Sequence, residues 1–168
     1  MDGSVYVLYG NGAGTNWATL RVSGGNGVDD SGLTLNGGEI VTDNITTDYW
    51  RFIIRDIILF DTSSIGVVNT ITSADFSLYF RNWSHNLTGD YYLSVYTSAP
   101  ASNTSLANGD FNSLGTTKQS NSNFATYTSA GYYTIALNGT GIGNVSKTGI
   151  SKFGTRDVTY DAGGATPI

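Results

Sequence analysis

The residues that could perform chemistry are few, and the first of them is the single histidine of the chain. His85 lies in the polar segment Asn82-Trp83-Ser84-His85-Asn86, between two strand-like runs. A serine nucleophile needs an oriented imidazole and a carboxylate within hydrogen-bond reach. Ser84 and Asp90 are only neighbours of His85 in sequence, and such neighbours rarely supply that geometry. The sequence therefore predicts an exposed loop histidine and no hydrolytic triad.

Paired carboxyl groups, which glycosidases use as acid, base or nucleophile, would have to come from aspartates, because Glu39 is the only glutamate. Most of the aspartates stand beside Gly, Ser, Thr or Asn, where their side chains form turns. The chain has no cysteine, which excludes thiol catalysis, disulfides and thiolate metal sites. We predict that the chain is not an enzyme and that it requires no cofactor.

A structural calcium ion is the metal that the sequence could accommodate. Calcium takes carboxylate and carbonyl oxygens from loops, and two Asp-bearing segments, residues 26–30 and 157–161, lie beside or at the end of strand-like runs. Neither segment has EF-hand spacing. The candidate ligands are Asp29, Asp30, Asp157 and Asp161. Ordinary turns made by the same aspartates are the favoured alternative.

Aromatic residues supply the candidates for a ligand platform. The chain has three tryptophans and eleven tyrosines. Trp83 in its polar loop, and Tyr92 and Tyr96 in the run 91–97, could stack on a sugar ring. Tyrosine also forms cross-strand pairs and packs at sheet edges, and this alternative is favoured. The same aromatic residues would suit a protein interface.

Glycosylation acceptor patterns are frequent in this Asn-, Ser- and Thr-rich chain. The Asn-x-Ser/Thr pattern begins at Asn44, Asn82, Asn86, Asn103, Asn138 and Asn144. Chance alone would produce several of these in such a composition. The pattern therefore permits glycosylation in a suitable host.

The elements that must position these residues are predicted to be strands throughout. Gln, Glu, Lys and Met, which normally fill helix surfaces, are nearly absent, whereas Gly, Ser, Thr, Asn and Tyr abound. Turn clusters separate runs typical of strands. These runs are residues 4–9, 17–22, 50–60, 70–80, 91–97, 132–138 and 152–160, with a weak pair at 33–41. Residues 98–122 are predicted to be mostly loop.

Two of these runs indicate which faces are buried. Residues 70–80 alternate in character and predict one core-facing side. The inward positions are Ala74, Phe76, Leu78 and Phe80, and the outward positions are Asp75, Ser77, Tyr79 and Arg81. In residues 50–60, WRFIIRDIILF, both faces are apolar, although a strand with one solvated face should alternate. Ile53, Ile57 and Leu59 therefore require a cover. That cover is either the long segment 98–122 or another subunit.

Charge excludes some partners. The formal net charge is −5, with a pI of about 4.4 and scattered Lys and Arg, whereas nucleic-acid binding requires a basic stripe. No run is long and apolar enough for a transmembrane helix, and the first residues lack signal-peptide features. The low content of charged residues, 12%, favours an extracellular, cell-surface or virion location.

The segment Arg55 to Ile65, RDIILFDTSSI, and the following ITSADFSLY (71–79) carry a resemblance. They resemble the β-sandwich modules called DNRLRE domains and their relatives in phage and metagenomic surface proteins, with later pieces at 108–111, 132–138 and 150–156. The resemblance implies an accessory part of a secreted, cell-surface or tail-associated protein, similar to carbohydrate-binding jelly rolls. The family pattern ends in one more apolar strand that this chain lacks, which would leave an edge for strand donation between subunits.

We therefore predict an all-β chain, a single antiparallel β-sandwich of jelly-roll type over residues 1–168. The predicted function is a non-enzymatic structural subunit of a surface fibre or virion appendage that assembles with copies of itself. The alternative is a carbohydrate- or receptor-binding module. No nucleic acid and no membrane insertion are expected.

Overall fold

The structure is a computed structural model that describes residues 1–31, 39–81, 91–124 and 129–168, and strands predominate in them. The strands are β1 (Asp2–Leu8), β2 (Gly27–Asp29), β3 (Ile40–Thr42), β4 (Trp50–Asp61), β5 (Asp75–Phe80), β6 (Leu93–Ser98), β7 (Leu114–Lys118), β8 (Gly131–Ala136) and β9 (Ile150–Asp157). The helical elements are α1 (Trp17–Val22), η1 (Ser63–Ile65), η2 (Asn108–Ser113), α2 (Gly139–Gly143) and η3 (Val158–Ala162). None of the helices in these ranges is long and apolar enough to span a membrane.

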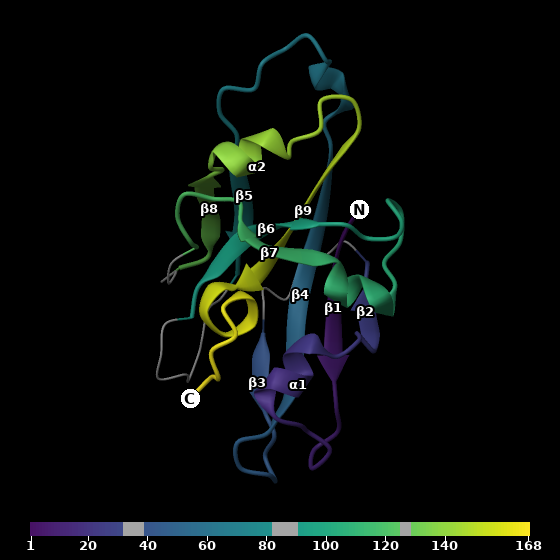
Figure 1. The fold of residues 1–168 in the computed structure, drawn as a ribbon, viewed down its shortest axis with the longest axis vertical. Coiled ribbons are helices and arrows are strands. Elements are labelled where there is room, and N and C mark those ends of the chain that lie inside the picture. The colour runs from purple at the N-terminus through teal and green to yellow at the C-terminus, as the bar shows by residue number, and fades with distance from the viewer. Residues whose placement is uncertain (32–38, 82–90, 125–128) are drawn as a thin grey trace.

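One large antiparallel sheet organises the molecule around β4 (Figure 1). Its strand order is β2-β1-β4-β9-β6-β7. β1 pairs along most of one side of β4, while β3 and β9 pair with the beginning and the end of its other side. β5 and β8 form a separate antiparallel ribbon. The chain is thus mostly β, as predicted, with a large sheet and a small second one.

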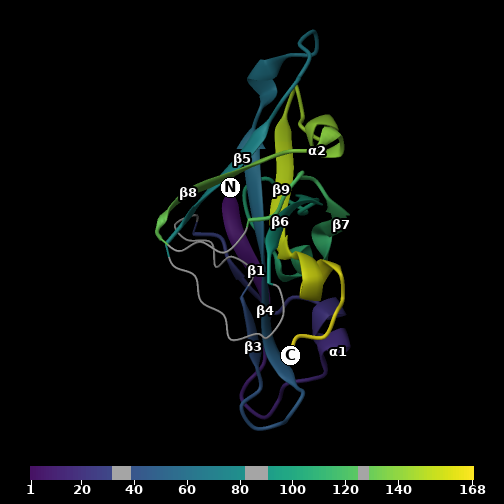
Figure 2. The ribbon, with the colours of Figure 1, turned by 90° about the vertical axis from the view of Figure 1, so that its left-hand side faces the viewer.

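The β5–β8 ribbon covers one face of the large sheet (Figure 2). Phe76 of β5 is buried, and its ring lies 5.6 Å from Phe60 of β4 and 6.2 Å from Phe153 of β9 between ring centroids. Ala74, Leu78 and Phe80 are partly buried against the same core. The alternation read from the sequence of this strand is confirmed.

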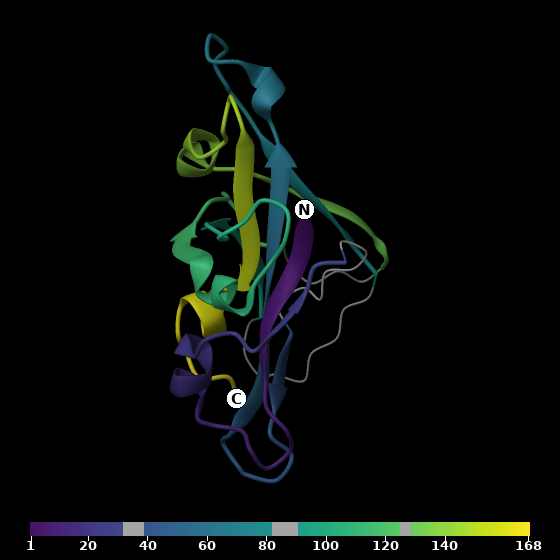
Figure 3. The ribbon, with the colours of Figure 1, turned by 90° about the vertical axis from the view of Figure 1, so that its right-hand side faces the viewer.

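The opposite face of β4 is covered by helical turns and by the segment after β6 (Figure 3). Gly3 and Gly154 flank Ile57 in register on the two neighbouring strands. A Cβ atom added to Gly3 would lie 2.8 Å from Leu106, and one added to Gly154 would lie 2.7 Å from Leu114. Glycine in both neighbouring strands therefore lets the leucines approach the sheet closely.

The hypothesis of a subunit interface at Ile53, Ile57 and Leu59 is corrected by this cover. All three side chains are buried within the chain and belong to its hydrophobic core. Leu106, Phe111 and Leu114, all within the predicted loop 98–122, are buried in the same core. The alternative, a cover made by the chain's own long segment, is what the structure has.

The largest error in the predicted elements is at residues 17–22, which form helix α1 and not a strand. Asn16 caps the helix by accepting a hydrogen bond from the Thr19 backbone N–H at 2.9 Å. Trp17 and Leu20, three residues apart, are both buried. An asparagine cap followed by this spacing is a helix signal, but six residues are too few for periodicity to separate helix from strand.

Other boundaries shift by smaller amounts. The last predicted strand, 152–160, ends at Asp157 and continues as the helical turn η3. The predicted loop 98–122 contains η2 and β7. Of the weak pair at 33–41, Ile40 and Val41 lie in β3, and residues 32–38 are outside the described part.

Ile57→Ala tests the burial of the second face of β4. Ile57 is fully buried, so its truncation should lower the free energy of unfolding by about 2–5 kcal/mol. Val68→Ala is the control, because Val68 is exposed in the loop after η1 and should change stability by less than about 0.5 kcal/mol. Urea unfolding measures both. Equal effects of the two substitutions would contradict the cover described here.

Candidate functional site

A buried cluster of three charged side chains joins the helical turn η3 to the sheet. The Asp161 carboxylate in η3 accepts hydrogen bonds from Arg55 of β4 (Nε 2.8 Å, Nη2 2.6 Å) and from Arg156 of β9 (Nε 2.9 Å, Nη2 2.8 Å). Arg55 also donates to the backbone oxygens of Phe111 and Arg21. Its guanidinium carbon lies 3.9 Å from the centroid of the Phe111 ring. This cluster ties η3, η2 and α1 to one face of β4.

The electrostatics of the cluster favour an ionised Asp161. Burial by itself would raise the pKa of Asp161, but the hydrogen bond from Arg156 and the charge and hydrogen bonds of Arg55 outweigh it and lower the pKa below its usual value. Burial also lowers the pKa of the Arg55 guanidinium, and Asp161 opposes that shift. The prediction of Asp161 as a calcium ligand is therefore corrected: two arginines occupy its carboxylate.

Asp157, the second predicted calcium ligand of this segment, caps the helical turn. Its carboxylate accepts hydrogen bonds from the backbone N–H groups of Tyr160, Asp161 and, at 3.0 Å, Tyr92. Burial raises the pKa of Asp157 to about 6 in spite of these donors. The favoured alternative, a turn made by the aspartate, agrees with this placement.

The other two predicted metal ligands lie in a different part of the molecule. Asp29 is exposed and accepts a hydrogen bond from the Ser31 backbone N–H at 3.1 Å, while Asp30 accepts one from Leu106 at 3.2 Å. Within the described ranges, no group of three or more His, Cys, Asp or Glu side chains is placed to hold a metal ion. The calcium hypothesis stays a prediction without support from Asp157 or Asp161.

The residues considered for catalysis, His85, Ser84 and Asp90, lie outside the described part of the chain. A different contact between hydroxyls and a carboxylate lies inside it. Ser4 donates to Asp56 at 2.7 Å and Thr155 donates to the same carboxylate at 3.0 Å. All three side chains are completely buried, so this contact links β1, β4 and β9 inside the core and offers no surface to a substrate.

The predicted aromatic platform is only partly available. Tyr96 is buried, and burial raises the pKa of its hydroxyl to about 12. The Arg156 guanidinium lies 5.9 Å from the centroid of its ring. Tyr96 is therefore a core residue, and its prediction as part of a ligand platform is wrong. Tyr92 is half-buried, and Trp83 lies outside the described residues.

A different pair of aromatic residues is exposed on the outer face of the β5–β8 ribbon. Tyr79 and Tyr132 are opposite each other in register, with ring centroids 5.1 Å apart and ring planes at 74°. Tyr79 is 55% exposed and Tyr132 is 78% exposed. Cross-strand aromatic pairs stabilise a β-ribbon, and adjacent exposed aromatic side chains also suit a binding surface.

Polar side chains lie beside the tyrosine pair on the same outward face of β5 and β8. In the next outward register row, Ser77 Oγ and Thr134 Oγ1 are hydrogen-bonded at 2.5 Å. One row further, Asp75 is exposed beside Ala136. We call the five residues Asp75, Ser77, Tyr79, Tyr132 and Thr134 the tyrosine strip. It combines two phenol rings, two aliphatic hydroxyls and one carboxylate on the outward face of a two-stranded ribbon.

Three of the five residues of the tyrosine strip could be found in the sequence. The alternation of residues 74–81 already places Asp75, Ser77 and Tyr79 on the outward side. Tyr132 joins them because β8 pairs with β5 in the register that sets Tyr132 opposite Tyr79. No local sequence pattern predicts that pairing, because fifty residues separate the two strands in the chain.

The glycosylation acceptors fall into three groups. Asn44 and Asn103 are exposed. The side-chain nitrogen of Asn138 donates to Lys118 and Ser120 backbone oxygens, and that of Asn144 donates to Gln119 at 2.7 Å, so attachment of a sugar there would break contacts of the fold. Asn82 and Asn86 lie outside the described part. Glycosylation stays a prediction.

Asp161→Asn tests the buried cluster. Loss of the carboxylate charge leaves two guanidinium groups buried without a counter-charge, so the free energy of unfolding should fall by about 3–5 kcal/mol. Asp29→Asn is the matched control, because Asp29 is exposed and should change stability by less than about 0.5 kcal/mol. The free energy of unfolding of both variants is measured in urea. If Asp161→Asn leaves that free energy unchanged, the cluster contributes nothing to stability.

The pH dependence of stability tests the raised pKa of Asp157. The folded-state pKa is about 6 against an ordinary value of 3.8, so between these values the folded state binds more protons than the unfolded state. The contribution of Asp157 to stability is therefore present below pH 3.8 and is lost as the pH rises to about 6. Asp161, whose pKa is lowered, acts only at pH values below that window.

The comparison is between the wild-type chain and Asp157→Asn in urea unfolding, at about pH 4 and about pH 7. We expect the wild-type chain to lose stability relative to the variant as the pH rises. Parallel profiles, or a wild-type chain that gains on the variant, would contradict the assignment. Subtracting the free energy of unfolding of the variant from that of the wild-type chain at each pH cancels the contributions of the other titrating groups.

Comparison of the chain with family models, with curated proteins and with solved structures finds no match.

Proposed function

We propose that the chain is a non-enzymatic carbohydrate-binding module that acts outside the cell or on a virion. The observation that carries the proposal is the exposed tyrosine pair, Tyr79 and Tyr132, beside the Ser77 and Thr134 hydroxyls. Binding sites for small molecules typically combine apolar or aromatic surface with a few polar groups that fix orientation. The tyrosine strip has that composition.

The chemistry of the tyrosine strip suits a sugar better than other ligands. A sugar ring presents C–H groups on one side, which pack on an aromatic face, and hydroxyls at its edge, which exchange hydrogen bonds with Ser, Thr and Asp side chains. Tyr79 and Asp75 are four residues apart on one strand, which separates them by about 13 Å along it. A short oligosaccharide could therefore contact both ends of the strip.

The support beneath the strip favours a pre-organised site. The inward side chains of the ribbon, including Phe76 and Ile135, are buried against the large sheet. Binding of a flat ligand to such a surface costs little ordering of the protein. The outward side chains are left available in the same strands, because successive residues point to opposite faces.

We infer that the complete architecture is a β-sandwich of jelly-roll type, in which the β5–β8 ribbon belongs to the second layer. Supporting this inference, residues 119–124 connect the two layers at one edge. Gln119 donates to Val95 of β6 at 2.8 Å, and Asn121 donates to Ala136 of β8 at 3.0 Å. The resemblance to carbohydrate-binding jelly rolls agrees with this architecture and with the proposed ligand.

The second candidate function is the structural subunit of a surface fibre or virion appendage. The buried residues Ile53, Ile57 and Leu59 no longer favour it. The observation in its favour is the exposed Val67-Val68 pair at one end of the molecule, where a neighbouring subunit could shield it from water. Both candidate functions agree with the low charge of the chain and with an extracellular location.

The double substitution Tyr79→Ala/Tyr132→Ala tests the carbohydrate proposal on a glycan array, followed by titration calorimetry with the best ligand. We expect at least a tenfold loss of affinity, because interface tyrosines often dominate binding energy. Tyr49→Ala is the control, since Tyr49 is an exposed tyrosine outside the strip and its loss should leave binding unchanged.

Two results would contradict the proposal. One is a wild-type chain that binds no glycan on the array. The other is binding that survives the double substitution, while the circular dichroism spectrum confirms that the variant is folded. That second result would reject the tyrosine strip as the binding site, and Trp83 and Tyr92, the aromatic residues predicted from the sequence, would be the next positions to substitute.

A further inference from the structure

The exposed tyrosine pair is also the place where two oxidisable rings meet. Tyr79 is 55% exposed and Tyr132 is 78% exposed, so an oxidant in the solvent reaches both phenols. Their ring centroids are 5.1 Å apart. Among the ring contacts between described residues, this is the one that joins two tyrosines. Radicals formed on the two rings would therefore be in contact from the start.

The pairing pattern of the ribbon brings these two side chains close together. The Leu137 N–H donates to the Ala74 oxygen at 2.9 Å, so these two residues are a hydrogen-bonded pair of the antiparallel ladder. Hydrogen-bonded and non-hydrogen-bonded pairs alternate along such a ladder. Tyr79 and Tyr132, five register rows further on, are therefore a non-hydrogen-bonded pair. The Cα atoms of such a pair are only about 4.5 Å apart, and its side chains approach each other most closely.

The β5–β8 ribbon is an element that a covalent bond between its strands would stabilise. It is a two-stranded sheet, and two strands by themselves are only marginally stable in water. Tyr79 and Tyr132 are more than fifty positions apart in the chain. The chain has no cysteine, so no disulfide can join the strands. The tyrosine pair stands where a bond between side chains would do the same.

We propose that Tyr79 and Tyr132 are the site of an intrachain dityrosine link, formed by hydrogen peroxide through a haem peroxidase, which fastens β5 to β8. The inference goes beyond carbohydrate binding and does not depend on it. It adds a modification site to the tyrosine strip.

The reaction balances without any group from the rest of the chain. Each phenol gives up one electron and one proton and becomes a phenoxyl radical. The two radicals join through one ring carbon each, ortho to the hydroxyl, in a new carbon–carbon bond. The hydrogen on each of these carbons then leaves as a proton, and each phenol oxygen takes up a proton, so both rings become phenols again. The two electrons and two protons reduce one hydrogen peroxide to two waters.

Formation of the link requires only movements of exposed side chains. The ring planes are at 74°, and the two rings must turn until their edges meet. Both rings are more than half exposed, so they turn in solvent. The inward side chains Phe76 and Ile135 stay buried against the large sheet, because successive residues of a strand point to opposite faces. The link therefore leaves the core unchanged.

The expected consequence is a more stable fold. A bond between Tyr79 and Tyr132 closes a long loop in the unfolded chain and lowers the entropy of that state. For a closed loop of about 50 residues, the melting temperature of a chain of this size should rise by roughly 5–15 °C. Thermal unfolding of the linked and the unlinked monomer measures this shift.

Treatment of the dilute protein with a haem peroxidase and hydrogen peroxide tests the proposal. We expect a monomer that is lighter by two hydrogen atoms, shows dityrosine fluorescence and yields a proteolytic fragment joining Tyr79 to Tyr132. Tyr132→Phe keeps the ring but removes the hydroxyl. It should lower the fluorescence of the monomer by about tenfold or more, because proximity strongly favours coupling within one molecule.

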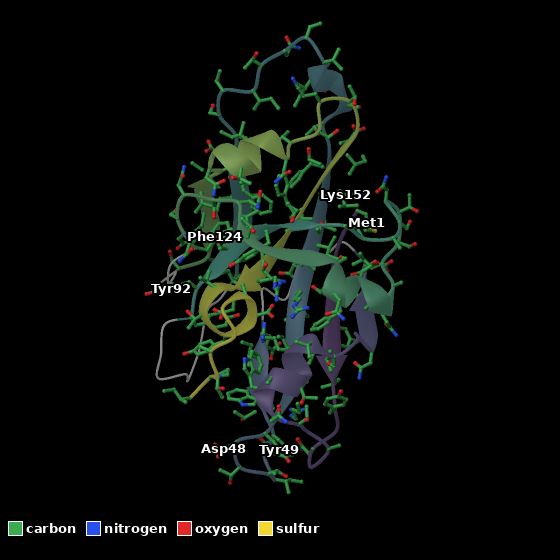
Figure 4. All side chains as sticks on the ribbon, in the orientation of Figure 1. Met1, Asp48, Tyr49, Tyr92, Phe124 and Lys152 are labelled. Carbon is green, nitrogen blue, oxygen red and sulfur yellow. The ribbon has the colours of Figure 1, made fainter. Side chains whose placement is uncertain are left out.

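Tyr49→Phe is the matched control. Tyr49 is also exposed, and Figure 4 places it at one extremity of the molecule, away from β5 and β8. This variant should form the link as the wild-type chain does. A wild-type monomer without dityrosine, a link that maps to other tyrosines, or monomer fluorescence that survives Tyr132→Phe would each overturn the proposal.

Two further results separate the parts of this inference. A linked monomer whose melting temperature is unchanged would reject the link as a fastening of the ribbon. Glycan binding is measured on the unlinked chain, so the carbohydrate proposal and the dityrosine proposal can fail independently of each other.

Discussion

The need to bury both faces of β4 is the constraint on which the rest of the structure depends. Ile53 and Ile57 lie on one face of this strand, and Ile54 and Ile58 on the other, and all four are buried. A single sheet exposes one face to water unless something covers it. The chain therefore builds two covers: the β5–β8 ribbon on one face, and helical turns with the segment after β6 on the other.

The helical turns of the second cover are held on the sheet by charged groups as well as by apolar contacts. Arg55 stands in the middle of the apolar face of β4, and its guanidinium would be costly to bury alone. Asp161 supplies the counter-charge from η3, and backbone oxygens from α1 and η2 accept the remaining hydrogen bonds. One polar cluster thus specifies how three short helical turns, each too short to be stable alone, are arranged on the sheet.

This use of both sheet faces leaves recognition to the outer surface of the ribbon. The proposed carbohydrate site lies on the outward side of the ribbon, whose inward side completes the core.

The sequence by itself determined the β class, the long apolar strand and the inward side of β5, because composition and alternation are local properties. Tertiary structure decided the rest. Tyr96 looked like a ligand platform, but the pairing of β6 with β9 buries it. Asp161 looked like a metal ligand, but two arginines from β4 and β9 reach its carboxylate. Tyr132 and Tyr79 became neighbours only through the register of β8 with β5. Each of these outcomes depends on contacts between residues far apart in the chain, which local patterns do not encode.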